Sequence, residues 1–255
     1  HASGRGRAAL RSSATGIALG IYATEFSQIL ADTPLVYAGT NSLAIASGRV
    51  SFVLGLHGPC ISFETACSAS LVACHSAVRA LRHSECDAHL AAGANLMLLQ
   101  SAGVGMAIAG MTSVMGRCHT FDSRADGFSR GEGTSCAALM LSVDAALGVY
   151  GSAVRQDGRS ASLTAPNGNA QQGLLCAALA DASMLAASLD MSEAHGTGTP
   201  LGDPIETSSL AKALLHSDDR KALAFSGVKG NVAHGESTAG TTGLLTLGFG
   251  LQGRG

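Results

Sequence analysis

The sequence predicts an α/β fold in which strands alternate with helices, and three observations point to it. Hydrophobic residues make up 46% of the 255-residue chain and charged residues only 13%, which is enough apolar surface for a sizeable core. Short apolar runs alternate with segments whose apolar residues recur at helical spacing. Several of these runs are apolar on both faces, as in strands buried between layers of helices.

The first part of the chain shows this alternation from Thr15 onward. Thr15–Ile21 is apolar and suited to a strand, and a helix is expected over 23–30. Apolar residues at helical spacing predict a helix over 41–54, which Gly58-Pro59 breaks. Cys60–Phe63 is a short strand, and a helix begins near Cys67.

Four further elements complete this first part, which we expect to form a domain over residues 1–148 with its first strand missing. They are a buried strand over 87–92, an irregular helix or loop over 97–110, a polar loop over 118–133 and a strand over 135–143.

A second series follows, expected as a partial domain over residues 149–255 without its closing strands. Its expected strands are 149–154, 191–194 and 223–228, and its helices are 171–189, 203–216 and 237–251. The helix at 203–216 has a start signal: Asp203 caps, Pro204 occupies the first turn and Glu206 comes three residues after the cap. The glycine-rich last helix is expected to pack tightly.

Composition and motif spacing argue against several classes of protein function. A net charge of −2 without a basic tract argues against nucleic-acid binding. The seven cysteines form no CxxC pair and the histidines no HExxH, so no metal site is expected. Unpaired cysteines are typical of a reduced, cytoplasmic protein, with Cys74, Cys136 and Cys176 in the core. Polar residues interrupt the most apolar stretch, 88–110, so no membrane span is expected.

Cys67 is a candidate nucleophile because it lies where a strand gives way to a helix. The first turn of a helix carries unpaired N–H groups and partial positive charge, which favour the thiolate and can hold an oxyanion. The bland interpretation, a buried cysteine at a helix start, fits this segment alone better.

Two further strand-to-helix junctions carry histidines. His195 precedes glycines that let a ligand approach the backbone, with Thr197 and Thr199 at a spacing of two. His234 follows Lys229, and Glu236 comes two residues later, so Lys229 and Glu236 are placed to pair across the loop. Taken singly, either histidine fits an ordinary turn equally well.

Together the three junctions predict one chemistry, because strand ends converge on one edge of α/β layers. A thiolate takes an acyl chain as a thioester, and a second thioester loses CO2 to give an enolate. Two imidazole N–H donors would stabilise the enolate oxygen, each by about 3–4 kcal/mol. The enolate carbon then attacks the held acyl group.

At this point the sequence resembles the β-ketoacyl synthase (ketosynthase) domains of type I polyketide synthases. The resemblance rests on the runs TACSASLVA from Thr65, EAHGTGTPLGDPIE from Glu193 and, with departures at Gly230, Val232 and Ala233, KGNVAHGESTAG from Lys229. Shorter matches are YAGT from Tyr37, GRCHTFD from Gly116, ADG from Ala125, RGEG from Arg130 and LTAPNG from Leu163.

The resemblance implies a thiolase-like fold with two similar βαβαβ halves in α/β/α/β/α layers, incomplete here. It implies that Cys67 carries the acyl chain, that His195 and His234 assist decarboxylation, and that Lys229 joins this catalytic set. It further implies that Glu236, together with Lys229, tunes or holds His234. Thr197 and Thr199 would contact a phosphopantetheine arm, and Glu236 is grouped with them as substrate-binding.

The partners implied are an acyl carrier protein that delivers the phosphopantetheine, acyl and malonyl-type thioesters, and a second copy in a homodimer. No cofactor is expected to bind directly. The family's opening strand and closing glycine–phenylalanine loop lie outside the sequence, so this stretch alone is expected to fold poorly or lack activity. Two alternatives stay open: a non-catalytic scaffold or chain-length subunit, and a cysteine hydrolase.

Overall fold

The computed structural model describes residues 6–22, 25–30, 34, 42–142, 145, 147–215 and 223–252. The chain divides into two compact units, each assembled from separate segments. The first unit comprises His1–Val104, Gly131–Ala146 and Gly235–Leu245, and the second comprises Gly105–Arg130, Leu147–His234 and Thr246–Gly255.

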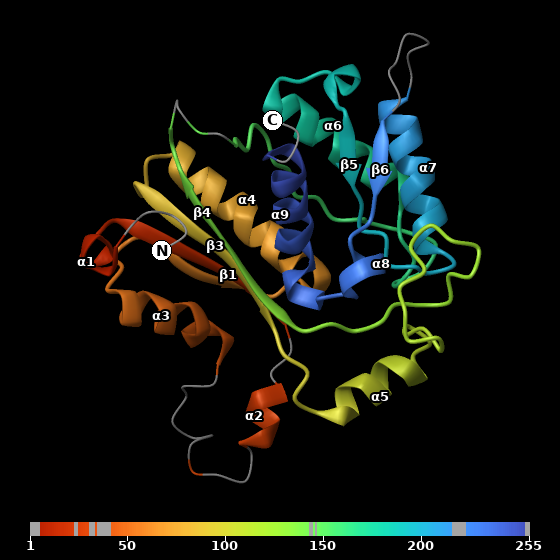
Figure 1. Cartoon of the computed structure of the whole chain (residues 1–255), viewed down its shortest axis with the longest axis horizontal. Helices are drawn as coiled ribbons and strands as arrows, with labels where there is room; N and C mark the ends of the chain where they lie inside the picture. The colour runs from red at the N-terminus through yellow and green to blue at the C-terminus, as the bar shows by residue number, and fades with distance from the viewer. Residues whose placement is uncertain are drawn as a thin grey trace. The chain divides into compact units, whose positions relative to one another are not determined.

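A four-stranded sheet in the order β2-β1-β3-β4 organises the first unit (Figure 1). Its strands are β1 (Thr15–Ile21), β2 (Cys60–Phe63), β3 (Ala88–Asn95) and β4 (Gly133–Met140). β1 pairs in parallel with β2 and β3, with Ile17 opposite both Cys60 and Leu90, whereas β4 runs antiparallel to β3. All four strands were expected, and β3 extends three residues beyond its predicted end.

The first unit also contains helical elements, some of which pack against the sheet. They are α1 (Arg7–Leu10), α2 (Glu25–Ile29), α3 (Leu43–Leu54), η2 (Ala66–Ser68), α4 (Ala69–Arg82), η4 (Glu236–Thr238), the start of α9 (Ala239–Gln252) and the start of α5 (Gln100–Ile108). α4 packs on β1 and β3, and the buried Cys74, Ala77 and Ala91 form a core cluster there.

Close approach of α4 to the sheet depends on glycine. A Cβ at Gly20 in β1 would lie 2.4 Å from the backbone nitrogen of Ser70, at the start of α4. Gly240 likewise lets α9 approach α4, since a Cβ there would lie 2.4 Å from Leu71 Cγ. The tight packing expected of the glycine-rich last helix is therefore observed.

The second unit contains α6 (Gly168–Ala182), η3 (Ala186–Ser188), β5 (Met191–Glu193), α7 (Gly202–Leu214), β6 (Ala224–Ser226) and α8 (Lys229–Val232). β5 and β6 form a parallel pair, with Met191 opposite Ala224, and α6 packs against α7 (Figure 1). The long segment 109–130 is irregular, and from residue 118 onward it is part of the expected polar loop, which ends where β4 begins at Gly133.

Two expected elements of the second unit differ in the structure. Residues 149–154 do not form the predicted strand; they run along α6 instead, where the Ser152 N–H donates to Asp181 Oδ2 at 2.9 Å. α6 stops at Ala182, well before the predicted end at 189, because Ser183 takes a left-handed conformation (φ 54°) and caps it.

Asp203 is not a helix cap, contrary to the sequence prediction. The N-cap of α7 is Leu201, and Asp203 is buried inside the first turn. Its carboxylate is instead bonded to loops that precede the helix, as described below.

Cysteine burial follows the prediction at only one of three positions. Cys74 is buried on the inner face of α4, but Cys136 and Cys176 are exposed. Cys136 lies on β4, an edge strand whose alternate residues are exposed, and α6, which carries Cys176, has no fully buried side chain. Among the described residues, no helix is long and apolar enough to cross a membrane. The YAGT run at 37–40 lies outside the described residues.

Candidate active site

Cys67 lies in a sharp turn between β2 and α4. The turn is a short 3₁₀ helix, η2, and Ala66 takes a left-handed conformation at φ 49°, which is strained for a residue with a side chain. The Ser68 hydroxyl donates to the carbonyl oxygen of Thr65 at 2.8 Å and holds the turn. Cys67 therefore lies in η2, and α4 begins two residues after it at Ala69, whereas the sequence predicted a helix start near Cys67. Cys67 is partly buried.

Glu236 lies in a second turn of the same kind within the first unit. It has φ 47° and opens η4, which leads into α9 as η2 leads into α4. η2 and η4 pack against each other, and the Thr241 N–H donates to Ser70 Oγ at 3.1 Å in the buried contact between the two helices. The first unit thus brings Cys67 and Glu236 into one neighbourhood.

His195 follows β5 in the second unit, and the carboxylate of Glu206 holds its backbone. Glu206 Oε1 accepts the His195 N–H at 2.6 Å, and Oε2 accepts the Gly196 N–H at 2.8 Å. Burial raises the pKa of Glu206, and the two backbone donors oppose that shift. The turn after His195 needs glycine, because Gly196 and Gly198 take positive φ values of 48° and 77°.

The threonine hydroxyls of this turn lie next to each other. Thr197 Oγ1 and Thr199 Oγ1 lie 3.1 Å apart, and Thr199 Oγ1 also accepts the Gly202 N–H at 3.2 Å. Thr197 is buried. The pair forms a polar spot directly after His195.

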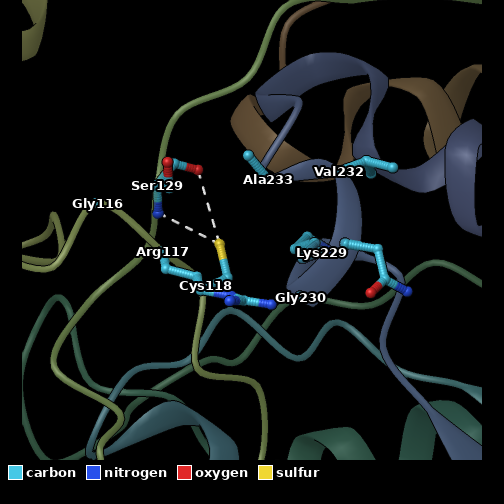
Figure 2. Close-up of a pocket in the computed structure, with 9 residues that line it drawn as sticks. Gly116, Arg117, Cys118, Ser129, Lys229, Gly230, Val232 and Ala233 are labelled. Carbon is cyan, nitrogen blue, oxygen red and sulfur yellow. Dashed lines mark hydrogen bonds between the residues drawn. The ribbon is translucent and has the colours of Figure 1, made fainter.

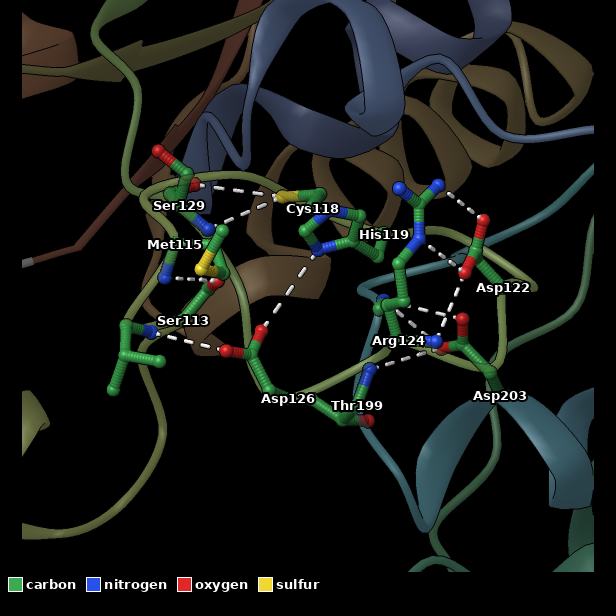
Figure 3. A network of polar contacts seen from close by, with 12 residues as sticks. Ser113, Met115, Cys118, His119, Asp122, Arg124, Asp126, Ser129, Thr199 and Asp203 are labelled. Carbon is green, nitrogen blue, oxygen red and sulfur yellow. Dashed lines mark hydrogen bonds and ion pairs between the residues drawn. The ribbon is translucent and has the colours of Figure 1, made fainter.

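Asp203 fixes the same turn from the other side (Figure 3). Its Oδ1 accepts the Gly198 N–H at 3.0 Å and the Thr199 N–H at 3.4 Å, and its Oδ2 accepts the Phe121 N–H at 2.8 Å. One buried carboxylate therefore ties the threonine turn to the irregular segment 109–130. Sequence reasoning assigned Asp203 and Glu206 to helix initiation and missed this role.

His234 is held by three consecutive residues of that irregular segment. Its backbone N–H donates to the carbonyl oxygen of Ser129 at 2.7 Å. The ring of Phe128 meets its imidazole edge-on, with 5.0 Å between ring centroids, and Arg130 forms a β-bridge with it. His234 is buried, and its ring centroid lies 5.6 Å from that of His195, with the planes at 88°.

Lys229 adds a buried cation beside the two rings. Its Nζ donates to the carbonyl oxygen of His195 at 2.5 Å. Burial, followed by the Lys229 ammonium, lowers the pKa of His195 to about 4 and that of His234 to about 3. Both imidazoles are neutral near pH 7, and a neutral imidazole keeps one N–H donor.

The second unit thus brings together five of the predicted site residues: His195, His234, Lys229, Thr197 and Thr199. The other two, Cys67 and Glu236, belong to the first unit, where they are neighbours. The pairing of Lys229 with Glu236 stays a prediction.

Two family models together match almost the whole chain. The β-ketoacyl synthase N-terminal domain model matches residues 1–145, and the C-terminal domain model matches residues 148–254. The chain belongs to the β-ketoacyl synthase family. The resemblance noted in the sequence is confirmed.

This ketosynthase chain is similar to a part of curated polyketide synthases, one of which is named as type I. It is 45% identical over 249 residues to the phenolphthiocerol synthesis polyketide synthase type I Pks15/1 of Mycobacterium bovis, covering 93% of this chain and 12% of the relative. It is also 42% identical over 252 residues to the polyketide synthase GfsB of Streptomyces halstedii, covering 93% of this chain and 4% of the relative.

Solved ketosynthase structures share the fold. The ketosynthase from module 6 of the Bacillus subtilis bacillaene synthase superposes with a TM-score of 0.87 at 34% identity, over 95% of this chain and 44% of that chain. The oxazolomycin ketosynthase domain of Streptomyces albus gives 0.85 at 33% identity, over 93% and 44%. The expected α/β fold of thiolase-like type is therefore confirmed, and this chain spans less than half of each of these ketosynthases.

Proposed function

We propose that this ketosynthase chain acts in polyketide chain extension, as a β-ketoacyl synthase that joins an acyl group to a malonyl-type extender. The observation that carries the proposal is the pair of neutral imidazoles, His195 and His234, held edge to face beside a buried lysine. Neutral rings donate N–H bonds, which is what an enolate oxygen needs. A cysteine in a strained turn before a helix supplies the matching nucleophile.

The proposed reaction has two stages. The Cys67 thiolate attacks the carbonyl carbon of an acyl thioester, the carrier thiolate leaves, and the acyl group is held on sulfur. A malonyl-type thioester then breaks its bond to the carboxylate, releases CO2 and leaves an enolate whose oxygen accepts N–H bonds from His195 and His234. The enolate carbon attacks the acyl carbon on Cys67, and the cysteine thiolate leaves with the electron pair of the broken carbon–sulfur bond.

The remaining site residues support these steps. Burial, followed by the charge of Lys229, keeps both rings neutral, and the bond from Lys229 to the His195 carbonyl oxygen fixes the start of the threonine turn. Thr197 and Thr199 present paired hydroxyls, a good match to the amides and hydroxyl of a phosphopantetheine arm. We assign Glu236, whose turn packs against that of Cys67, to holding the second histidine and the substrate side of the site.

The partners we propose are an acyl carrier protein, which delivers the phosphopantetheine-bound substrates, and a second copy of the chain. Homodimer formation is supported by β2, which pairs only with β1 among the described strands and exposes Ile61. Phe52 and Val53, at the end of α3, are exposed as well. The division into halves at about residue 148 is consistent with the two family matches. A reducing, cytoplasmic location remains our proposal, in keeping with seven free cysteines.

The test separates acyl loading from condensation. Purified protein is incubated with an acyl thioester alone and then with malonyl-carrier protein, and mass spectrometry follows the mass of Cys67 and the β-keto product. Cys67→Ala should abolish loading, whereas His234→Ala should leave loading intact and stop condensation. Cys176→Ala, an exposed thiol on α6, is the matched control and should behave like wild type.

Each alternative has its own outcome. Loading followed only by release of free acid would identify a cysteine hydrolase, and absence of loading on Cys67 would identify a non-catalytic scaffold. Condensation at wild-type rate in His234→Ala would refute the assignment of the imidazoles.

A further inference from the structure

Cys118 contacts the segment that holds His234 through both polar atoms of one residue. Its Sγ lies 3.2 Å from the Ser129 nitrogen, whose N–H it accepts, and 3.7 Å from the Ser129 carbonyl oxygen, to which the thiol donates (Figures 2 and 3). Cys118 is 2% exposed. Burial raises the pKa of the Cys118 thiol, so the sulfur keeps the proton that it donates.

The Ser129 carbonyl oxygen is shared between the thiol and the second histidine. It accepts the backbone N–H of His234 at 2.7 Å, while Phe128, which precedes Ser129, packs its ring edge-on against the His234 imidazole. Residues 128–130 therefore contact both the backbone and the ring of His234. A thiol that fixes Ser129 at its nitrogen and its oxygen limits the freedom of the 128–130 backbone in two directions.

A cavity of about 350 Å³ adjoins this contact in the second unit (Figure 2). Its lining includes Cys118 and Ser129 on one side and Lys229 and Ala233, which directly precedes His234, on the other. Because the cavity borders both the sulfur and Ser129, side chains do not fill the space on this side of Ser129. Removing the thiol should therefore enlarge an existing cavity rather than create an isolated void.

We propose that Cys118 is a positioning residue for the second imidazole: its thiol clamps the Ser129 backbone and thereby fixes His234 for condensation. This inference rests on the proposed function for its effect on rate but not for its effect on the histidine. A displacement of a reacting group by about 1 Å can cost about a hundredfold in rate.

The experiment compares Cys118→Ala, Cys118→Ser and Cys86→Ala. The last removes a buried thiol from the first unit and controls for lost packing. Wild type and variants are assayed for acyl loading of Cys67 and for condensation, and each is labelled at histidine so that NMR follows the imidazole resonances of His234 with pH. The His234 resonances are assigned with His234→Gln.

We expect Cys118→Ala to load acyl groups normally, to condense about tenfold to a hundredfold more slowly at saturating substrate, and to shift the His234 resonances. Cys118→Ser keeps a donor and acceptor at the position and should recover most of the rate, and Cys86→Ala should match wild type in both readouts. Unchanged His234 resonances and rate in a folded Cys118→Ala would overturn the inference. A wild type that loads no acyl group or does not condense would instead refute the proposed function, and the NMR comparison would still decide the role of Cys118.

Discussion

Asp203→Asn should destabilise the second unit, because it removes one acceptor from a carboxylate that has both oxygens occupied. Oδ1 accepts N–H groups of Gly198 and Thr199, and Oδ2 accepts that of Phe121 at 2.8 Å. An asparagine retains one oxygen, so whichever way the amide points, its NH2 group faces a backbone N–H. A buried, unsatisfied donor costs about 1–3 kcal/mol, and the bonds lost to the charged oxygen add to that cost.

The free energy of unfolding should therefore fall by about 3 kcal/mol. For a chain of this size each kcal/mol lowers the melting temperature by about 2–4 °C, so the expected drop is about 6–12 °C. Thermal unfolding followed by far-UV circular dichroism measures it. The matched control is Asp122→Asn: Asp122 lies in the same irregular segment, but its carboxylate pairs at 2.8 Å with Arg124, whose side chain is exposed.

The control should leave the melting temperature nearly unchanged, since an exposed ion pair is screened by solvent. Equal melting temperatures for wild type, Asp203→Asn and Asp122→Asn would refute the reasoning, because they would mean that the buried carboxylate does not hold the threonine turn.

Three further predictions concern pH, backbone packing and the contact between helices. Folding lowers the pKa of His195 from 6.5 to about 4 and that of His234 to about 3, so below pH 6.5 the unfolded chain binds protons that the folded chain does not bind. The free energy of unfolding should therefore be highest above about pH 6.5 and should fall as the pH drops toward 4. In a series of thermal melts, the double variant His195→Gln/His234→Gln should show a smaller loss of stability over this pH range. Gly20→Ala should lower the free energy of unfolding by about 1–3 kcal/mol, because the new Cβ would collide with the backbone of α4. Gly48→Ala in α3 has open space around it and should raise the free energy of unfolding by about 0.5–1 kcal/mol. Urea unfolding measures both, and the opposite ranking would contradict the packing argument. Ser70→Ala leaves the buried Thr241 N–H without its acceptor and should cost about 1–3 kcal/mol in the same assay, while Ser123→Ala, at an exposed position, should change nothing measurable.

The alternation of strands and helices could be predicted from the sequence, because strands such as Thr15–Ile21 and Cys60–Phe63 are apolar and are flanked by residues that end regular structure. It failed over 149–154, where apolar residues suit a strand but α6 supplies the backbone partner instead. Local composition does not reveal which neighbour will satisfy a backbone, so such errors arise from tertiary contacts.

For the candidate site, nucleophile and histidines were recognisable because each motif combines a reactive side chain with small residues at a junction. The carboxylates of Asp203 and Glu206 were interpreted from their spacing alone. That spacing predicted Asp203 as a helix cap, whereas in the structure its buried carboxylate accepts hydrogen bonds from the preceding turn. One available signal was the pair of acidic residues three apart, Asp203 and Glu206, directly after a glycine-rich turn that has several backbone donors to satisfy. The bond between Cys118 and Ser129 had no comparable signal, since it depends on how an irregular segment folds back.

The carbonyl oxygen that receives the His234 N–H comes from a residue made about a hundred positions earlier in synthesis. Closing a loop of this length costs conformational entropy, and contacts between residues far apart in the sequence slow folding. A nascent chain released before residue 234 has been made would contain the 118–130 segment without the histidine it orients, whatever structure its sheet had reached. His234 can therefore take its observed position only after both of these distant parts of the chain have been translated.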